Sequence, residues 1–326
     1  MLPAGPAARQ EVFSGKGKVI IMTRATANLL VGAHMSIAGG VAGAFARGVE
    51  AGCATMQIFT RNQTQWKAPP LPEEEVARFR AEQERTGIAP VVAHGSYLVN
   101  LASPDPVLLA RSREGFLEEL RRAGALGLSC VITHPGAHMG AGVEAGLTRV
   151  AASLDWVGER AGAGGPLVCL ENTAGQGTVL GGDFAHFGAI FGRVKNPSRL
   201  GVCVDSCHGH AAGYDFATAS GYERALASLE AAVGPGRVLA VHLNDAKGER
   251  GSRLDRHEHI GRGKIGLEGF RLFMNDPRWA RVPKIIETPK EEGGRQMDPV
   301  NLAVLRRLAG TTKVPKALLR EIEADK

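Results

Sequence analysis

The chain has 326 residues, of which 44% are hydrophobic and 22% are charged, a balance typical of a folded globular protein. No apolar stretch reaches the length of a membrane span or a secretory signal, which argues against a membrane role and favours the cytoplasm, or the nucleoid within it. Lys and Arg number 39 against 33 for Asp and Glu, so the formal net charge is +6. This excess favours a phosphate-bearing or nucleic-acid partner, and a mildly basic protein without a polyanionic partner is the plain alternative.

Cysteine usage indicates a reducing compartment. The five cysteines, an odd number, form no CxxC pair, and four of them lie in or beside apolar runs. We therefore expect reduced thiols in the protein core.

In chain order, residues 1–28 show no sustained periodicity, and we expect them to form a disordered extension. From Leu29 on, short apolar runs alternate with longer segments that have helix patterns. One such segment, residues 72–87, begins with Pro and three acids and ends with Gly, as a helix should. The eight apolar runs are LLVGAH, TMQIFT, PVVAHG, CVITHPG, LVCLEN, LGVCVDSCH, VLAVHLND and PKIIETP.

Eight strand and helix units without a break in composition predict a single-domain TIM-type (β/α)8 barrel over residues 29–312. The runs are continuous in Val, Ile, Leu and Cys, as parallel strands buried on both faces should be. A doubly wound open sheet is the main alternative. Residues 313–326 are expected to form a charged C-terminal tail.

Polar residues end six consecutive predicted strands. The carboxyl ends of all strands in such a barrel meet at one opening, so these residues should converge. Any one of them alone could be a buried polar group or a lone base. Together, without neighbouring Lys or Arg, they would be costly to bury unless cations lie among them. The strand-end residues are His94, His134, Glu171, Asp205 with His208 beyond it, His242 and Glu287.

The loop after the seventh strand adds Asp255 and His257, whose side chains would lie on the same side of an extended backbone. The loop is rich in Gly, Arg and Lys, as a loop that approaches a phosphate backbone closely would be; a solvated charged loop is the alternative. Nine potential ligands suggest up to three ions. His, Asp and Glu in an open site suit zinc or manganese, and such clusters serve phosphoryl transfer.

Two predicted rim loops pair polar residues with large apolar ones. Trp66 follows the second strand, and Tyr97 and Leu98 follow the third. Side chains of this type can wedge into a duplex, although packing of the rim loops is an equal interpretation for Tyr97 and the better one for Trp66. His34, at the end of the first strand, is expected near the pocket floor, in either a supporting or a purely structural role.

These motifs together resemble the endonuclease IV family of apurinic/apyrimidinic endonucleases. The resemblance runs over residues 29–287, nearly the whole barrel. It is carried by GAHMSIAGG, FTRNQTQW, HGSYLVNLASP, HPGAH, ENTAGQG, GVCVDSCH, AAGYD, HLNDAKGERGSRLDRHEHIGRG and IIETP.

The resemblance implies a TIM barrel that binds three zinc ions, with one site open to manganese, and that acts as a monomer. The implied reaction is hydrolysis of the phosphodiester 5′ to an abasic site in double-stranded DNA, which leaves a 3′-hydroxyl and a 5′-deoxyribose phosphate. A 3′-phosphodiesterase side activity is also implied.

The resemblance also implies roles for individual residues, with Glu171 as the catalytic residue that positions the attacking nucleophile. The implied first zinc site is His94, His134 and Glu171; the second is Asp205, His242, Glu287 and the shared Glu171; the third is His208, Asp255 and His257. The implied DNA contacts are Gln63, Tyr97, Leu98 and Arg256. At Thr64, relatives can carry an Arg suited to the minor groove, so one such contact is missing here.

Two other function classes fit parts of the pattern. A sugar isomerase or epimerase on the same kind of barrel also uses carboxylates and His at strand ends. It needs only one or two ions, however, and the DRHEH segment of the loop after the seventh strand has no role in its chemistry. A non-catalytic DNA-binding or metal-storage protein would not need ligands around an open barrel mouth.

Overall fold

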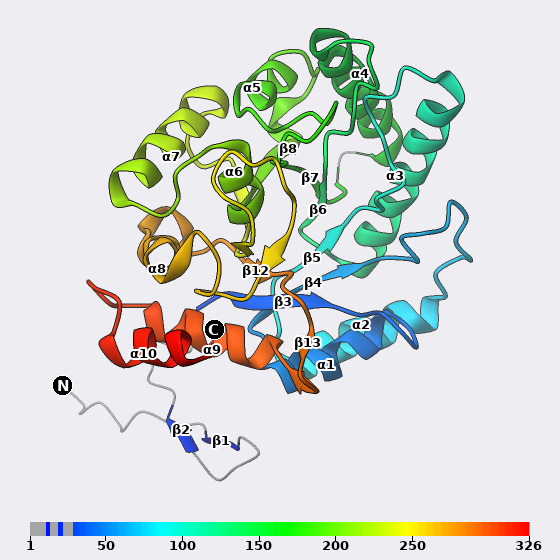
Figure 1. The fold of residues 1–326 in the computed structure, drawn as a ribbon. Helices are drawn as coiled ribbons and strands as arrows, with labels where there is room; N and C mark the ends of the chain where they lie inside the picture. Colours follow the sequence, from blue (N-terminus) through cyan, green and yellow to red (C-terminus); the bar gives the residue numbers. More distant parts are fainter. Residues whose placement is uncertain (1–10, 14–18, 22–28, 163, 326) are drawn as a thin grey trace, which may run out of the picture.

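A computed structural model describes residues 11–13, 19–21, 29–162 and 164–325. Eight parallel strands close into one barrel, in the order β12-β3-β4-β5-β6-β7-β8-β9 (Figure 1). All eight strands expected from the sequence are present, and the predicted single-domain TIM-type barrel is confirmed. The strands are β3 (Val31–Met35), β4 (Thr55–Phe59), β5 (Val91–His94), β6 (Cys130–Thr133), β7 (Leu167–Glu171), β8 (Leu200–Asp205), β9 (Val238–His242) and β12 (Lys284–Ile286).

Helices surround the barrel (Figure 1). Their ends follow local chemistry: the Asp105 carboxylate accepts a hydrogen bond from the Leu108 N–H at the start of α3, and Gly127, with φ of 77°, ends that helix. The helices are α1 (Ala44–Ala51), α2 (Glu73–Thr86), α3 (Pro106–Leu126), α4 (Val143–Ala161), α5 (Ala185–Phe191), α6 (Ser206–Ala212), α7 (Ala219–Val233), α8 (Gly266–Asn275), α9 (Asp298–Leu308) and α10 (Lys316–Ala324). Short 3₁₀ turns are η1 (Val41–Gly43), η2 (Pro197–Arg199) and η3 (Pro277–Trp279).

Short antiparallel strand pairs lie outside the barrel. They are β1 (Glu11–Phe13) with β2 (Val19–Ile21), β10 (Asp245–Ala246) with β11 (His257–Glu258), and β13 (Glu291–Glu292) with β14 (Arg295–Gln296). The expected disordered extension, residues 1–28, lies mostly outside the described residues. Its described parts are β1 and β2, two strands that the sequence pattern did not predict.

Alternation along each strand sorts the side chains into two sets. In β8, Val202 and Val204 belong to the large core between barrel and helices, whereas Cys203 belongs to a second core inside the barrel. The members of this inner apolar core are Val92, Cys130, Ile132, Cys169, Cys203, Ala240 and Ile285. All five cysteines are buried and free of disulfides, as expected.

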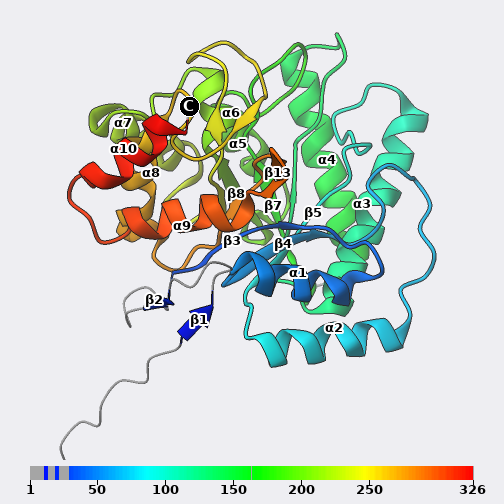
Figure 2. The ribbon, with the colours of Figure 1, turned by 60° about the horizontal axis from the view of Figure 1, so that its bottom comes forward.

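The C-terminal segment differs from the expected charged tail. Residues 316–324 form α10, because Leu318 and Ile322 are four residues apart and are buried together on one helix face. Arg307 of α9 forms an ion pair with Glu321 of α10, and the two helices lie on the same flank of the barrel (Figure 2). Among the described residues, none of the helices combines the length and the apolar character required to traverse a bilayer.

Lys284 of β12 is only 3% exposed, and its ammonium donates hydrogen bonds to the carbonyls of Trp279 and Val282. Burial lowers its pKa to about 8, although Asp276 opposes the shift. Between about pH 8 and 10 the folded chain therefore holds one proton fewer than the unfolded chain at this residue. The contribution of Lys284 to the free energy of unfolding should therefore rise with pH in that window, by about 1.4 kcal/mol per pH unit.

This dependence can be measured by denaturant unfolding of wild type and Lys284→Met at several pH values from 7 to 10. We expect the difference in free energy of unfolding, wild type minus variant, to increase as pH rises. Parallel pH dependences in the two proteins would contradict a lowered pKa at Lys284.

Candidate metal centre

The candidate ligands form a polar layer directly above the inner apolar core. Each of six strands has an inner apolar residue, and two positions further along the chain lies an acid or a histidine on the same face. The pairs are Val92 and His94, Ile132 and His134, Cys169 and Glu171, Cys203 and Asp205, Ala240 and His242, and Ile285 and Glu287. Strand alternation therefore brings these six side chains to one opening.

The first group of potential ligands is His94, His134 and Glu171. The Nε2 atoms of His94 and His134 lie 3.0 and 3.2 Å from the same oxygen, Oε2 of Glu171. Glu171 is completely buried, whereas the His134 side chain is 29% exposed. The group is therefore reached from the barrel opening on the His134 side.

The second group is Glu171, Asp205, His242 and Glu287, so Glu171 belongs to two groups. Nδ1 of His242 lies 2.8 Å from Oε1 of Glu171, 3.2 Å from Oε2 of Glu287 and 3.8 Å from Oδ2 of Asp205. One imidazole nitrogen thus faces three carboxylates. The two oxygens of Glu171 face different groups, as a bridging carboxylate requires.

The third group is His208, Asp255 and His257. Oδ1 of Asp255 lies 3.1 Å from Nε2 of His208 and 3.4 Å from Nε2 of His257. The Asp255 side chain is 46% exposed, so this group is the most open of the three. All nine residues named from the sequence thus lie together, in the three sets that the resemblance implied.

Each of four histidines places its second ring nitrogen beside a backbone carbonyl or an amide oxygen. Nδ1 of His94, His208 and His257 lies 2.7, 2.9 and 3.2 Å from the carbonyls of Gly95, Asn172 and Glu287, respectively. Nε2 of His242 lies 2.8 Å from Oε1 of Gln57. A proton on these outward nitrogens leaves the inward nitrogens free to bind a metal, which is the usual arrangement of metal-binding histidines.

Acids and imidazoles shift one another's protonation strongly. Burial raises the pKa of Glu171, but His242 and neighbouring imidazoles more than offset this and hold it well below its usual value. Burial lowers the pKa of all three imidazoles, but their neighbours more than offset it. Asp205, Asp255 and Glu171 raise the pKa of His208 well above its ordinary value, and Cys203 with Glu287 and Glu171 does the same for His242. Asp255 and Asp205 raise the pKa of His257 to about 9. Within the described part of the chain, no Lys or Arg forms an ion pair with the acids of the three groups. The positive charge that balances these carboxylates is therefore carried by protons or by bound cations.

Two cysteines near the groups are poor competitors as ligands. Cys203 lies close to Glu171 and His242, and Cys207 lies close to Asp205 and His257. Burial raises the pKa of the Cys203 thiol to about 12 and that of Cys207 above its usual range as well. Only the thiolate is a good metal ligand, so the oxygen and nitrogen donors are favoured.

Sequence reasoning missed three amides that hold the acids in place. Gln57 donates to Oε1 of Glu287 at 2.6 Å and also meets His242. Asn244 donates to Oδ2 of Asp205 at 2.7 Å, and Asn172 accepts from the Asp205 N–H. Strand alternation could have identified Gln57, because Met56 and Ile58 belong to the outer core and a glutamine between them must point into the barrel.

His34 also reaches this layer, with Nδ1 3.4 Å from Oε1 of Glu287, on the carboxylate side that Gln57 contacts. It therefore lies beside the second group; the sequence pattern predicts only a position near the pocket floor. Burial lowers the pKa of its imidazole, with Glu287 opposing the shift.

The residues named as DNA contacts lie on loops at the same end of the barrel. The Tyr97 side chain is 65% exposed, and its ring lies 5.8 Å from Phe59 and 5.6 Å from His94 between ring centroids. Leu98 and Gln63 are half-buried, and Arg256 is exposed between two residues of the third group. These positions are compatible with contact to a bound duplex.

Trp66, by contrast, packs against α3. A Cβ built at Gly115 of that helix would lie 3.7 Å from the Trp66 ring, so the ring lies close over the helix backbone. The packing role that the sequence analysis favoured for this residue agrees with the structure.

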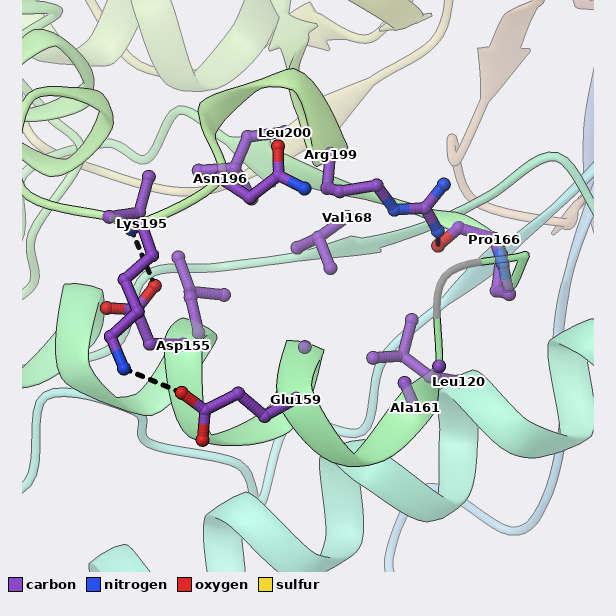
Figure 3. Close-up of a pocket in the computed structure, with 14 residues that line it drawn as sticks. Leu120, Asp155, Glu159, Ala161, Pro166, Val168, Lys195, Asn196, Arg199 and Leu200 are labelled. Atoms are coloured by element: carbon purple, nitrogen blue, oxygen red, sulfur yellow. Dashed lines mark hydrogen bonds and ion pairs between the residues drawn. The ribbon is translucent and has the colours of Figure 1, made fainter.

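A cavity of about 350 Å³ lies at the other end of the strands, beside the beginnings of β7 and β8 (Figure 3). Its polar groups are paired with one another: the Lys195 ammonium lies 2.7 Å from the Glu159 carboxylate, and Arg199 donates to the Pro166 carbonyl. It contains none of the nine candidate ligands, so the chemistry is to be sought at the opposite end.

Comparison with known proteins gives consistent matches. A family model described as a xylose isomerase-like TIM barrel matches residues 45–308. A probable endonuclease 4 from Chloroflexus aurantiacus is 50% identical over 277 residues, which cover 85% of this chain and 97% of that protein. A probable endonuclease 4 from Geobacter sulfurreducens is 45% identical over 281 residues, which cover 86% of this chain and 95% of that protein.

Solved structures give the same result. Endonuclease IV from Thermus thermophilus superposes with a TM-score of 0.74 at 36% identity, over 89% of this chain and 99% of that chain. A D-tagatose 3-epimerase-like protein superposes with a TM-score of 0.62 at 18% identity, over 90% of this chain and 99% of that chain, which shows a shared fold alone. On the extent of the sequence matches, this chain belongs to the endonuclease IV family of apurinic/apyrimidinic endonucleases.

Proposed function

We propose that this chain hydrolyses the phosphodiester bond 5′ to abasic sites in double-stranded DNA, as a base excision repair enzyme, and that it does so with three bound zinc ions. The products would be a 3′-hydroxyl and a 5′-deoxyribose phosphate, with 3′-phosphodiesterase activity as a side reaction. The observation that carries the proposal is the arrangement of nine ligand side chains in three groups at one barrel opening.

The donor set fits zinc. His94, His134 and Glu171 would hold the first ion; Glu171, Asp205, His242 and Glu287 the second; and His208, Asp255 and His257 the third. Imidazole nitrogens and carboxylate oxygens are ordinary zinc ligands, and one of the sites could accept manganese. When bound, zinc ions would lower the pKa of water and offset charge on the phosphate and the leaving oxygen.

Glu171 is the catalytic residue of this proposal. Its carboxylate faces the first group through Oε2 and the second through Oε1, and His242 with the neighbouring imidazoles keeps it ionised despite its burial. It can therefore hold a water molecule in line with a phosphate at the opening. Gln57 and Asn244 keep Glu287 and Asp205 in fixed orientations, which lowers the reorganisation needed during the reaction.

Duplex recognition would use the rim and the net charge. Tyr97 and Leu98 can wedge beside the lesion, Gln63 and Arg256 can contact the duplex, and the charge of +6 favours a polyanion. An abasic nucleotide has no base to unstack, so moving it toward the centre is cheap and contributes selectivity. Family membership favours this proposal over a sugar isomerase or epimerase on the same barrel.

The proposal is tested with a duplex oligonucleotide that carries one abasic site, with metal content measured on the same samples. Wild type should incise 5′ to the lesion and contain about three metal ions per chain. Glu171→Gln should lose about 1,000-fold or more in kcat, since it removes the carboxylate shared by two groups. Glu268→Gln, on the surface helix α8, is the matched control. Wild type that carries three metal ions but leaves the duplex intact would refute the proposal.

Gln57→Leu removes the acceptor for Nε2 of His242 and one donor to Glu287. We expect the zinc affinity of the second group to fall about 10- to 100-fold, because supporting contacts of this kind orient metal ligands. Competition with a chromogenic chelator measures the affinity. Thr55→Val, a buried change on the same face of β4, should leave it unchanged. Equal affinities in Gln57→Leu and wild type would exclude an orienting role.

Tyr97→Ala tests the rim. We expect KM for the abasic duplex to rise about tenfold or more, since an aromatic contact to a nucleotide contributes about 1–3 kcal/mol, with zinc content unchanged. Steady-state kinetics on the same oligonucleotide give this value. Val49→Ala, an exposed apolar residue on α1, is the control. A KM equal to that of wild type would remove Tyr97 from the duplex interface.

A further inference from the structure

The loop of residues 247–265 carries two of the three side chains of the third group, Asp255 and His257, and its only strand or helix is the two-residue strand β11. β10 pairs with β11, which places Ala246 opposite His257. The Lys247 N–H donates to the Arg256 carbonyl at 3.0 Å, and the Lys264 N–H donates to the Ala246 carbonyl at 2.9 Å. In Figure 1 the loop is the yellow segment beside α6. Since ordering a loop costs conformational entropy, something must compensate for its fixed shape.

The carboxylate of Asp245, at the start of β10, binds the return end of this loop. It is completely buried, and its oxygens accept hydrogen bonds from backbone N–H groups only. No ion pair joins it to Lys, Arg or His in the described part of the chain. The five donors are the N–H groups of Ala246 at 2.9 Å, Gly261 at 2.9 Å, Gly263 at 3.0 Å, Ile265 at 2.9 Å, and Gly266 at 3.3 Å.

Converging backbone N–H groups of this kind form an anion-binding concavity. Here the anion is part of the chain itself. Burial raises the pKa of Asp245 to about 6, with the backbone hydrogen bonds opposing the shift, so the group is ionised at neutral pH. An ionised carboxylate has two acceptor oxygens and no donor, which suits five N–H groups. A neutral amide at this position would place its own N–H₂ donor against some of these backbone N–H donors.

The glycines of the segment GRGKIG allow the backbone to wrap closely around this carboxylate. A Cβ at Gly263 would lie 2.5 Å from the Ala246 carbonyl oxygen and 2.6 Å from Oδ1 of Asp245. Gly261 and Gly266 have φ of 85° and 71°, which favours glycine. From the sequence, this glycine-rich run indicates a loop that approaches a phosphate backbone closely. In the structure the N–H groups of these three glycines are directed to Asp245 instead.

We propose that Asp245 is the positioning residue of the third metal site: its carboxylate folds the loop so that Asp255 and His257 face His208. The proposal rests on the three-metal centre of the proposed function. The connection is direct, because the same two-residue strand that bears Asp245 pairs with the strand that bears His257. Loss of the anion would release the return end of the loop and widen the 3.1 and 3.4 Å spacings at Asp255.

The experiment counts metal ions per chain in wild type, Asp245→Asn and Asp255→Asn after zinc loading and gel filtration, and follows release of each ion to a chelator. Asn keeps the size of Asp but replaces one acceptor oxygen with a donor. We expect three ions in wild type and two in Asp255→Asn. In Asp245→Asn we expect either two ions or a third ion bound at least about tenfold more weakly, with the first two unchanged.

Asp276→Asn is the matched control for general destabilisation. Asp276 is an acid with a buried side chain that caps η3 and accepts from the Tyr222 hydroxyl, away from the three groups. This variant should lower the melting temperature but keep three ions. If it also lost one ion at a similar melting temperature, the positioning role of Asp245 would be refuted.

Gly263→Ala keeps the test decisive if Asp245→Asn does not fold, since its methyl group displaces the carboxylate from the loop side. Loss of one ion in Gly263→Ala supports the role, and three tightly bound ions in this variant refute it. Three ions in wild type and in every folded Asp245 and Gly263 variant would refute the inference and leave the proposed function intact. Fewer than three in wild type would refute the three-metal centre itself, and the inference with it.

Discussion

Closure of the barrel is the constraint on which the rest of the structure depends. When eight parallel strands close, alternate side chains of every strand must point inward, and inward residues at the same height form one layer. The lower layer here is apolar and includes Cys169, Cys203 and Ile285, and two residues further on the layer is polar. The lower layer excludes water from the interior of the barrel below the polar layer. The charged side chains of the polar layer are therefore exposed to solvent only at the barrel opening.

Charge balance in the polar layer then limits what the site can be. Glu171, Asp205 and Glu287 lie within 4 Å of a single nitrogen of His242, an arrangement that repels itself unless positive charge is added. The imidazoles supply that charge when protonated, and they become neutral ligands when a cation takes its place. The amides of Gln57, Asn172 and Asn244 hold the same geometry in either case, since their hydrogen bonds to the acids do not depend on the imidazole protons.

The barrel fold by itself does not specify the chemistry of this chain. A D-tagatose 3-epimerase-like structure has the same fold at 18% identity. The third group depends on a loop that is not part of the barrel, and the Asp245 carboxylate and three glycines give that loop its shape. Function on a common fold resides largely in its loops, and this loop supplies two of the three side chains of the third group.

The sequence by itself determined the barrel and the polar strand ends, because strand length, apolar continuity and helix caps are local properties. It also indicated the inward face, since alternation of two along a strand is visible in one dimension. Only the tertiary structure decided that Gln57 and Asn244 hold the acids, that residues 316–324 form a helix, and that the glycines near residue 263 surround Asp245. These features depend on contacts between residues far apart in the chain, and a pattern read along one segment does not contain them.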